Sequence, residues 1–449
     1  MHVHLYRTYC VTEDAYVFAW SDVAPSTCST DTSHQIDASR QSVVRSVGDS
    51  VTEISPALPR SVFSALRTGS FNVIHQINHA YDTMADDAMD TKLVGQGSVV
   101  VEDSIAKLRV EAQAGDRVVY QTRNYIRYVP GLSKMYMISW VPLFAGSGVV
   151  SRCGAFDDAR DYAAEYVTST SGYGHFMEYS TADGWAVVER RNAVDSRVLA
   201  ADWNLAPWVA GDLACDKTLL LVIEMAWLGV GPARIGVVLE EETITWLHRW
   251  YHGHLSEPYV PVGKSPVRFE IEATGSGTGQ AEARGICATT LVENYDATVE
   301  ATTTSHVTVY REKTVNTSGT EMFFRMRPES RMGWSLYSIT AVTSGNSPIT
   351  WAVYSCRSSS GGTWEPIDLL TDLEINETAT CIDSSEDILL MKGMVLPDVP
   401  QEKIVPRSQV RNYWHPYMDG TPEVIMVKIV GKTGTVSVDI DLTFSEDRV

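Results

Sequence analysis

The sequence predicts an all-β protein of two β-sandwiches in tandem, preceded by a short N-terminal arm and one helix. Runs of β-branched and aromatic residues recur from residue 97 almost to the C-terminus, and turn-forming glycine, proline and aspartate separate them. The length of 449 residues also exceeds what one ordinary core supports. Two or three domains are therefore expected.

Residues 1–65 are predicted to be an attachment arm. One plausible strand, Tyr9–Trp20, runs into the turn-rich segment 24–34, whose Ser, Thr, Asp and Pro residues favour local side-chain hydrogen bonds over regular structure. The segment Ser55–Pro59 closes the arm. Because so short a stretch cannot build a good core of its own, we expect it to dock on a partner.

Residues 66–96 are predicted to form a helical linker. Its apolar residues recur at steps of three and four, which is the spacing of one helix face. A helix packed on the following sandwich accounts for this stripe, and a short trimeric bundle is the alternative. The stripe consists of Val73, Ile77, Ala80, Tyr81, Met84 and Ala88.

Residues 97–301 are predicted to form a central sandwich of jelly-roll or lectin-like type, because short strands alternate with turn signals and helical periodicity is nearly absent. Residues 302–449 are predicted to form a C-terminal sandwich. Its last strand alternates cleanly, with Val436 and Val438 on one face and Ser437 and Asp439 on the other. The predicted central strands include 98–102, 117–121, 135–140, 186–189, 219–223 and 267–271.

Composition excludes some functions. The net charge of −20 argues against a nucleic-acid or anionic-membrane binder, since phosphate recognition needs clustered Lys and Arg. The longest apolar run, 219–231, contains Glu224 and is too short to span a bilayer, and the N-terminus lacks a signal-peptide pattern. A soluble protein is expected, and if it acts outside a cell, it must leave by lysis or within a particle.

The seven cysteines are scattered and form no Cys-x-x-Cys motif, so mostly reduced, buried thiols are expected. Two pairs have a spacing that permits a disulfide bond, Cys10 with Cys28 and Cys356 with Cys381. The sequence does not choose between a bond and free thiols at either pair.

A glycine-rich stretch near residue 230 is interpreted as a structural hairpin. Apolar runs flank it on both sides, and its glycine spacing fits neither the dinucleotide-binding nor the P-loop pattern. Gly and Pro supply the tight turn. The residues assigned to this hairpin are Trp227, Gly229, Gly231, Arg234 and Gly236.

Three histidines, His248, His252 and His254, lie on one face of a predicted strand and suggest zinc ligands. Residues four apart on a strand are about 13 Å apart, too far to share one ion, so no metal or cofactor is predicted. The acidic clusters Asp157–Asp158 and Glu240–Glu242 allow a catalytic pair or a structural cation, but charges at loop tips commonly serve solubility. No catalytic motif is present, and no catalytic residue is assigned.

Aromatic side chains are concentrated in the central sandwich. A sugar-stacking platform is one interpretation, for which Trp246, Trp250 and Tyr251 are the candidates. Core packing or subunit contact is the other interpretation, since a sandwich of this size must fill its interior. The same alternatives apply to Trp185, Trp203 and Trp208.

A series of motifs resembles structural proteins of large double-stranded DNA viruses and tailed phages, described variously as virion, fibre or capsid-associated proteins. The motifs are Asn124-Tyr-Ile-Arg-Tyr-Val-Pro-Gly131, Val150-Ser-Arg-Cys-Gly-Ala-Phe-Asp157, Gly174-His-Phe-Met-Glu178, Ala201-Asp-Trp-Asn204, Trp227-Leu-Gly-Val-Gly-Pro-Ala-Arg-Ile-Gly236 and Pro266-Val-Arg-Phe-Glu-Ile271. The resemblance implies a non-catalytic particle component that contacts other virion proteins. A homotrimer is favoured, since closed symmetry leaves no open-ended contact. The alternative function is host attachment through cell-surface glycans.

Overall fold

The computed structural model of the chain describes residues 3–447 with gaps. The chain forms two compact units, Met1–Gly69 and Ser70–Val449. In the described residues, no helix is long and apolar enough to cross a membrane. The description omits residues 14, 22–23, 29–32, 48–70, 81–87, 112, 127, 129–131, 162–171, 227, 240–243, 262, 276–278, 294–303, 328–332, 345–346, 357–358, 369–370, 382–387, 397–400, 405–416 and 419–420.

The N-terminal unit contains a three-stranded antiparallel sheet in the order β2-β1-β3. Its strands are β1 (Val3–Cys10), β2 (Ala15–Ser21) and β3 (Ile36–Val47). The single strand predicted over Tyr9–Trp20 is therefore wrong, because the polar residues Thr12 and Glu13 form a turn that folds β2 back on β1. The side chain of Thr12 accepts a hydrogen bond from the Gln35 backbone N–H, which ties this turn to the start of β3.

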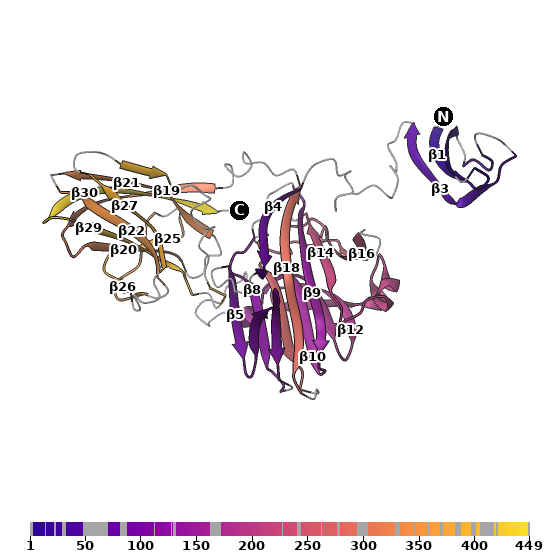
Figure 1. Ribbon diagram of the computed structural model, residues 1–449, viewed down its shortest axis with the longest axis horizontal. Helices are drawn as coiled ribbons and strands as arrows, with labels where there is room; N and C mark the ends of the chain where they lie inside the picture. Colours follow the sequence, from indigo (N-terminus) through magenta and orange to yellow (C-terminus); the bar gives the residue numbers. More distant parts are fainter. Residues whose placement is uncertain are drawn as a thin grey trace. The chain divides into compact units, whose positions relative to one another are not determined.

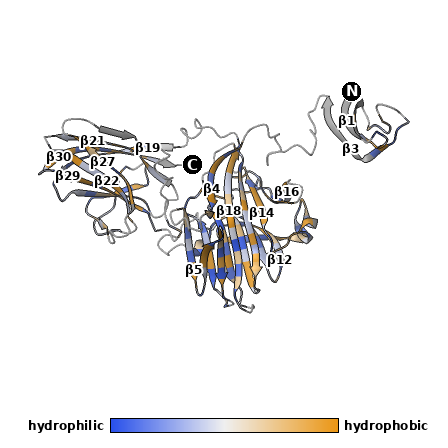
Figure 2. Ribbon diagram, in the orientation of Figure 1, coloured by the Kyte–Doolittle hydropathy of each residue, from blue (hydrophilic) through white to orange (hydrophobic). Residues whose placement is uncertain are grey.

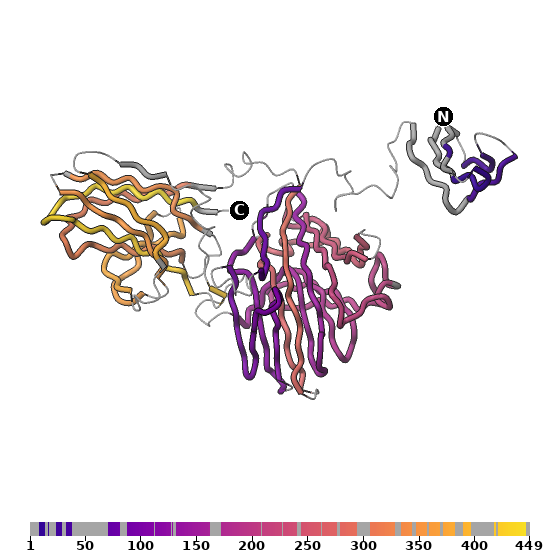
Figure 3. The backbone as a smooth tube through the Cα atoms, viewed as in Figure 1, coloured from indigo at the N-terminus to yellow at the C-terminus, as the bar shows by residue number. Residues whose placement is uncertain are grey.

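The helix predicted in the linker is also wrong, since β4 (Phe71–Asn78) and β5 (Met89–Val94) are strands. β4 pairs with β18 (Ala281–Glu293), which runs beside it in Figure 3. Ile77 is buried but Val73 is exposed, so the apolar stripe does not form a packed face. The open edge of β18 offers backbone partners to this segment, and this long-range pairing outweighs its local periodicity. Residues 81–87 lie outside the described part.

Unit Ser70–Val449 begins with a sandwich of two antiparallel sheets (Figure 1). The seven-stranded sheet has the order β13-β12-β11-β10-β17-β8-β5, and the other has the path β16-β15-β14-β9-β18-β7-β6 with β4 added beside β18. The new strands are β6 (Ser98–Glu102), β7 (Ile105–Val110), β8 (Arg117–Thr122), β9 (Lys134–Ala145), β10 (Val149–Phe156), β11 (Gly174–Ser180), β12 (Gly184–Arg191), β13 (Val194–Leu199), β14 (Leu219–Met225), β15 (Ala233–Val238), β16 (Ile244–Trp250) and β17 (Val267–Ala273).

The chain crosses between these sheets repeatedly, for example from β8 to β9, from β9 to β10 and from β17 to β18. Short 3-10 turns at Ala159–Asp161, Ala200–Asp202 and Pro207–Gly211 occupy some of the connections. One large apolar core fills the space between the sheets and includes Trp140, Tyr120 and Phe269. Hydrophilic and hydrophobic residues mix along these strands (Figure 2), as expected of sheets with two different faces.

A second sandwich follows, built on a four-stranded sheet (β19-β30-β21-β28) and a six-stranded sheet (β24-β25-β20-β29-β22-β27). Val436, Val438, Ile440 and Leu442 are all buried, which confirms the predicted alternation. The all-β tandem sandwich is thus confirmed. Its strands are β19 (Thr304–Val315), β20 (Thr320–Met326), β21 (Gly333–Ser344), β22 (Ile349–Cys356), β23 (Ser359–Ser360), β24 (Glu365–Pro366), β25 (Leu373–Asn376), β26 (Thr380–Cys381), β27 (Ile388–Val395), β28 (Gln401–Ile404), β29 (Val424–Gly431) and β30 (Val436–Asp447).

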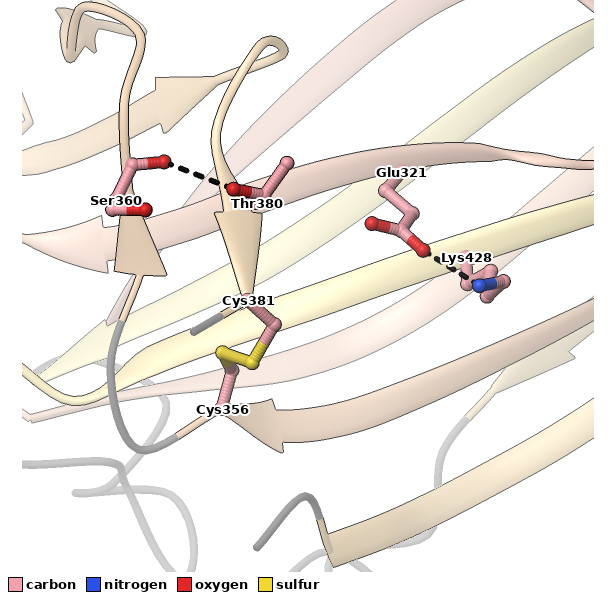
Figure 4. The surroundings of a disulfide bond; sticks show 6 residues. All are labelled: Glu321, Cys356, Ser360, Thr380, Cys381 and Lys428. Carbon is pink, nitrogen blue, oxygen red and sulfur yellow. Dashed lines mark hydrogen bonds and ion pairs between the residues drawn. A yellow bond between two sulfur atoms is a disulfide. The ribbon is translucent and has the colours of Figure 1, made fainter. Parts of the chain in front are cut away.

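Of the two cysteine pairs that the sequence leaves open, Cys356 and Cys381 form a disulfide bond (Figure 4). The bond joins the end of β22 to β26, which pairs with β23 through a two-residue ladder. Cys10, Cys28 and Cys153 are buried and form no disulfide bond. The prediction of mostly reduced thiols therefore holds for five of the seven cysteines.

Candidate functional site

The outer face of the seven-stranded sheet carries buried charged side chains. Along β17, Val267, Phe269 and Ile271 belong to the core between the sheets, so the alternating residues Arg268 and Glu270 lie on the opposite face. Both side chains are fully buried. Since a buried charge is costly unless it is paired and hydrogen-bonded, this face must supply partners.

Glu270 is the centre of this charged network. Its carboxylate accepts hydrogen bonds from Arg152 at 2.7 Å, Arg268 at 2.9 Å and Arg117 at 3.2 Å. Asp161 closes the network, because it lies 2.9 Å from Arg117 and 2.6 Å from Arg268. The partners come from three neighbouring strands and one 3-10 turn, so the network forms only when the sheet is assembled.

Arg190 extends the network along β12. Two of its nitrogens contact the two carboxylate oxygens of Asp195 at 2.6 and 2.8 Å, a bidentate geometry that fixes the guanidinium plane. Asp158 lies 3.3 Å from the same arginine. The guanidinium also lies over the rings of Phe156 and Phe176, 5.4 and 5.1 Å from their centroids. The Arg190 guanidinium is therefore held between its carboxylate partners and the two aromatic rings.

Beside these residues lies a hollow of about 450 Å³. Apart from small side chains and Val150, its lining is charged, with Arg152, Arg160, Arg190, Asp158, Asp195 and Glu272. Three positive and three negative groups give a formal sum of zero. The Arg160 side chain is 52% exposed and contacts Glu272 at 3.0 Å, so part of this charged surface is accessible to a ligand.

The arginines keep the carboxylates ionised. Burial by itself raises the pKa of Glu270, but Arg268, Arg117 and Arg152 outweigh it and hold that pKa well below its usual range. The pKa values of Glu272 and Asp158 are lowered by neighbouring arginines against the same effect of burial. Retaining and inverting glycosidases need a carboxylic acid with a raised pKa, and these three groups have the opposite shift.

A second polar cluster is buried between the two sheets. His175 and Glu189 face each other across β11 and β12, and His252 reaches them from the end of β16. Nε2 of His252 lies 2.5 Å from a Glu189 carboxylate oxygen, its Nδ1 lies 2.6 Å from the Gly231 carbonyl oxygen, and its ring stacks on Tyr259. The three groups offer ligand atoms within 4.8 Å of one another.

The three histidines that strand spacing rejected as joint zinc ligands, His248, His252 and His254, do not form this cluster together. His248 packs against Trp250 and accepts a hydrogen bond from the Asn204 backbone N–H, while His254 is exposed. His252 instead meets groups from the opposite sheet. The spacing of histidines along one strand does not predict the contact of His252 with Glu189, because Glu189 belongs to the other sheet.

Stability is expected to fall as the pH drops from about 7 to about 5. Burial lowers the pKa of His175, which faces Glu189, His252 and Arg191, and burial also lowers the pKa of His75 to about 4. The folded state therefore binds fewer protons than the unfolded state, whose histidines have a pKa near 6.5. The stabilisation is complete above about pH 6.5 and decreases below it by up to about 1.4 kcal/mol per pH unit for each such histidine.

Urea unfolding at both pH values measures this slope. His175→Gln is expected to flatten it, and His254→Gln, at an exposed position, is the matched control. An identical slope in wild type and His175→Gln would contradict the assignment.

Of the residues assigned to the structural hairpin, Gly229 and Gly231 lie between β14 and β15, which pair antiparallel, and Arg234 and Gly236 lie within β15. Gly229 has φ +78°, and a Cβ on Gly236 would lie 2.7 Å from the Thr245 carbonyl oxygen. The Gly231 carbonyl oxygen contacts His252, as described above. Arg234 donates to Glu224 at 2.7 Å and stacks on the Trp246 ring. Trp227 lies outside the described residues.

The proposed aromatic platform is not a continuous surface. Trp250 is a core residue with 8% exposure, so its ring is unavailable to a sugar, and its assignment to the platform is corrected. Trp246 is half-buried under Arg234, while Tyr251 is 61% exposed beneath Arg249. Trp185 and Trp203 are core residues, and the side chain of Trp208 lies outside the description.

Of the two acidic clusters in the sequence, the structure describes Asp157–Asp158. Asp157 is buried and accepts hydrogen bonds from the backbone N–H groups of Gly172 and Tyr173, and Asp158 belongs to the charged network. Neither residue is a solvated loop-tip charge, because backbone N–H groups and the Tyr125 hydroxyl satisfy the Asp157 carboxylate, and arginines of the sheet pair with Asp158. Glu240–Glu242 lie outside the described part of the chain.

Sequence reasoning missed the arginines of the network, Arg117, Arg152, Arg160, Arg190 and Arg268. One signal was present. The segment Arg268-Phe-Glu270-Ile-Glu272 alternates charged and apolar residues inside a predicted strand, which places like-facing charges side by side. Its burial depends on strands that are distant in sequence.

Comparisons with known proteins give structural likenesses only. No family model matches the chain, and no curated protein matches it. Peanut lectin in complex with a nonapeptide covers 50% of this chain and 97% of its own, with 14% identity and a TM-score of 0.31. The VIP36 exoplasmic/lumenal domain, in a form bound to Ca²⁺ and Man3GlcNAc, covers 49% and 89%, with 10% identity and a TM-score of 0.32.

The CBM2 module of the evolved Dit protein of Lactobacillus casei BL23 phage J-1 covers 51% of this chain and 98% of its own. Its identity is 8% and its TM-score is 0.33.

Proposed function

We propose that the chain is a glycan-binding attachment protein whose sugar site is the charged hollow on the outer face of the seven-stranded sheet. The observation that carries this proposal is the composition of the hollow, in which three arginines and three carboxylates form ion pairs and balance each other in charge. This function corresponds to the host-attachment alternative of the sequence analysis, with its site moved from the aromatic residues to the sheet.

The chemistry of the hollow favours a neutral sugar. Guanidinium groups donate and carboxylates accept, so adjacent Arg and Asp or Glu side chains match neighbouring hydroxyl groups, which do both. An anionic ligand would meet Asp158, Asp195 and Glu272, whereas a cation would meet Arg152, Arg160 and Arg190. A ligand without net charge avoids either repulsion.

Binding without cleavage is the proposed activity. The lowered pKa values of Glu270, Glu272 and Asp158 leave these carboxyl groups ionised at neutral pH, and an ionised group cannot protonate a leaving oxygen. Ion pairing with arginine also weakens each of them as a nucleophile. These features support a recognition site rather than a hydrolytic one.

A virus particle is the proposed setting, with other virion proteins and copies of the same chain as partners. This part of the proposal rests on the motif resemblance in the sequence. The trimer rests on the symmetry argument given with it. A monomeric mass in solution would count against the trimer, and absence from purified particles would count against the setting.

A glycan array that carries neutral, sialylated and sulfated oligosaccharides tests the sugar site. We expect binding to neutral members, and calorimetry with the best of them should show about tenfold or greater weakening in Arg160→Ala, because a hydrogen bond from a charged donor contributes about 1.5–3 kcal/mol. Ala193→Trp, at the edge of the hollow, should abolish binding by filling it.

Val194→Trp is the matched control, since Val194 is 69% exposed, lies next to Ala193 and does not line the hollow. It should bind as wild type does. A protein that binds no glycan on the array, or an Ala193→Trp variant that binds normally, would refute the proposed site.

A further inference from the structure

Four side chains of the N-terminal unit converge at one point. Cys10 ends β1, Glu13 lies in the turn after it, Cys28 lies in the loop that follows β2, and His34 lies just before β3. They offer two thiol sulfurs, a carboxylate oxygen and an imidazole nitrogen, and these atoms lie within 4.8 Å of one another. Residues from both turns of the sheet thus meet although up to 24 positions separate them.

The distances within this cluster fit one shared ion. Nδ1 of His34 lies 3.8 Å from the Cys10 sulfur and 3.1 Å from a Glu13 carboxylate oxygen. Zinc–sulfur bonds of about 2.3 Å and zinc–nitrogen or zinc–oxygen bonds of about 2.0–2.1 Å place tetrahedral ligand atoms about 3.3–3.8 Å apart. The same histidine nitrogen faces both partners, as a nitrogen directed at a central ion would.

The burial of the cluster is also that of a closed site. Cys10 and Cys28 are 0% and 2% exposed, whereas the His34 and Glu13 side chains are 25% and 33% exposed and cover it from outside. The unit has little else to hold it together, since its apolar cluster in the described residues consists of Cys10, Val17 and Cys28 with Ile36 beside them. Domains this small usually need a metal or disulfide bonds for stability.

We infer that Cys10, Glu13, Cys28 and His34 bind one structural zinc ion that fixes the fold of the N-terminal unit. Two thiolates and an imidazole select a borderline-soft ion such as Zn²⁺ over Mg²⁺ or Ca²⁺. Four protein ligands complete the tetrahedron, so the site is structural and not catalytic. This inference is independent of the proposed sugar site, which lies in the other unit.

Metal analysis of the full chain is the test. Protein purified without chelator should contain one zinc per chain, and Cys10→Ser and Cys28→Ser should contain none. Cys287→Ser removes an exposed thiol outside the cluster and should keep the full content. Replacing zinc with Co²⁺ in wild-type protein should give the intense visible absorption of tetrahedral thiolate coordination, and His34→Cys should retain the metal and shift that spectrum.

Thiol counting separates zinc from the disulfide alternative. Of the five cysteines outside the disulfide bond, two should react with a thiol reagent only after the metal is chelated. Chelation should also open the N-terminal unit to proteases and leave the sandwiches of the second unit intact. A Cys10–Cys28 disulfide bond, zinc content unchanged in Cys28→Ser, or wild-type protein that binds neither Zn²⁺ nor Co²⁺ would overturn the inference.

Discussion

Glu270→Gln is expected to lower the free energy of unfolding of the central sandwich by about 3–5 kcal/mol, the usual cost of removing one partner from a buried ion pair. Glu270 is 0% exposed and contacts Arg117, Arg152 and Arg268. The glutamine keeps the shape of the side chain but removes its charge. Three arginines then remain around a neutral group, away from the water that would otherwise solvate them.

Chemical denaturation monitored by tryptophan fluorescence measures this loss, because Trp140 and Trp185 lie in the central core. Glu102→Gln is the matched control in the same sandwich. Glu102 pairs with Lys107 and Arg109, but its side chain is 48% exposed, so less than about 1 kcal/mol is expected. Similar losses in the two variants would show that the burial of Glu270 does not determine its energetic role.

Removal of the disulfide bond between Cys356 and Cys381 is the second large effect. The double variant Cys356→Ala/Cys381→Ala is expected to lose about 3–4 kcal/mol of stability in the C-terminal sandwich, the chain-entropy value for a loop of this length. The two cysteines are 25 residues apart, and the bond limits the unfolded chain more than the folded one. Glu321→Gln, which removes a partly exposed ion pair with Lys428 on the adjacent strands (Figure 4), should have a much smaller effect.

The midpoint of denaturation, measured with and without reductant, tests this prediction. Reductant should destabilise wild-type protein to the level of the double variant and leave the variant unchanged. The transition of the central sandwich should not move, since distant sites contribute independently. Equal midpoints for oxidised and reduced wild type would exclude a stabilising bond at this position.

The local pattern of apolar and polar residues predicts a strand correctly where one of its faces is exposed to water and the other is buried. The alternation of Val436, Val438, Ile440 and Leu442 predicts the buried face of β30 because the side-chain period of a strand is two. The turn signals likewise predict the many short strands of both sandwiches. Such information lies within a few residues, so one sequence carries it.

Local pattern failed where a distant partner decides the conformation. Phe71–Asn78 has helical spacing but pairs with β18. Local pattern also left Trp250 open between a sugar-stacking residue and a core residue, and the structure places it in the core beside His175. In both cases the competing interaction comes from a segment far along the chain, whose position is unknown until the sheets are assembled.

Composition, strand periodicity and turn residues predict the fold class, the approximate strands and the presence of thiols, imidazoles and paired charges. Which of these groups meet depends on the assembled sheets. Glu270 finds its arginines across neighbouring strands, and Cys10 finds His34 across the turns of a small sheet. The physical reason is that strand periodicity fixes the face on which a side chain lies, whereas strand order and sheet packing fix its neighbours.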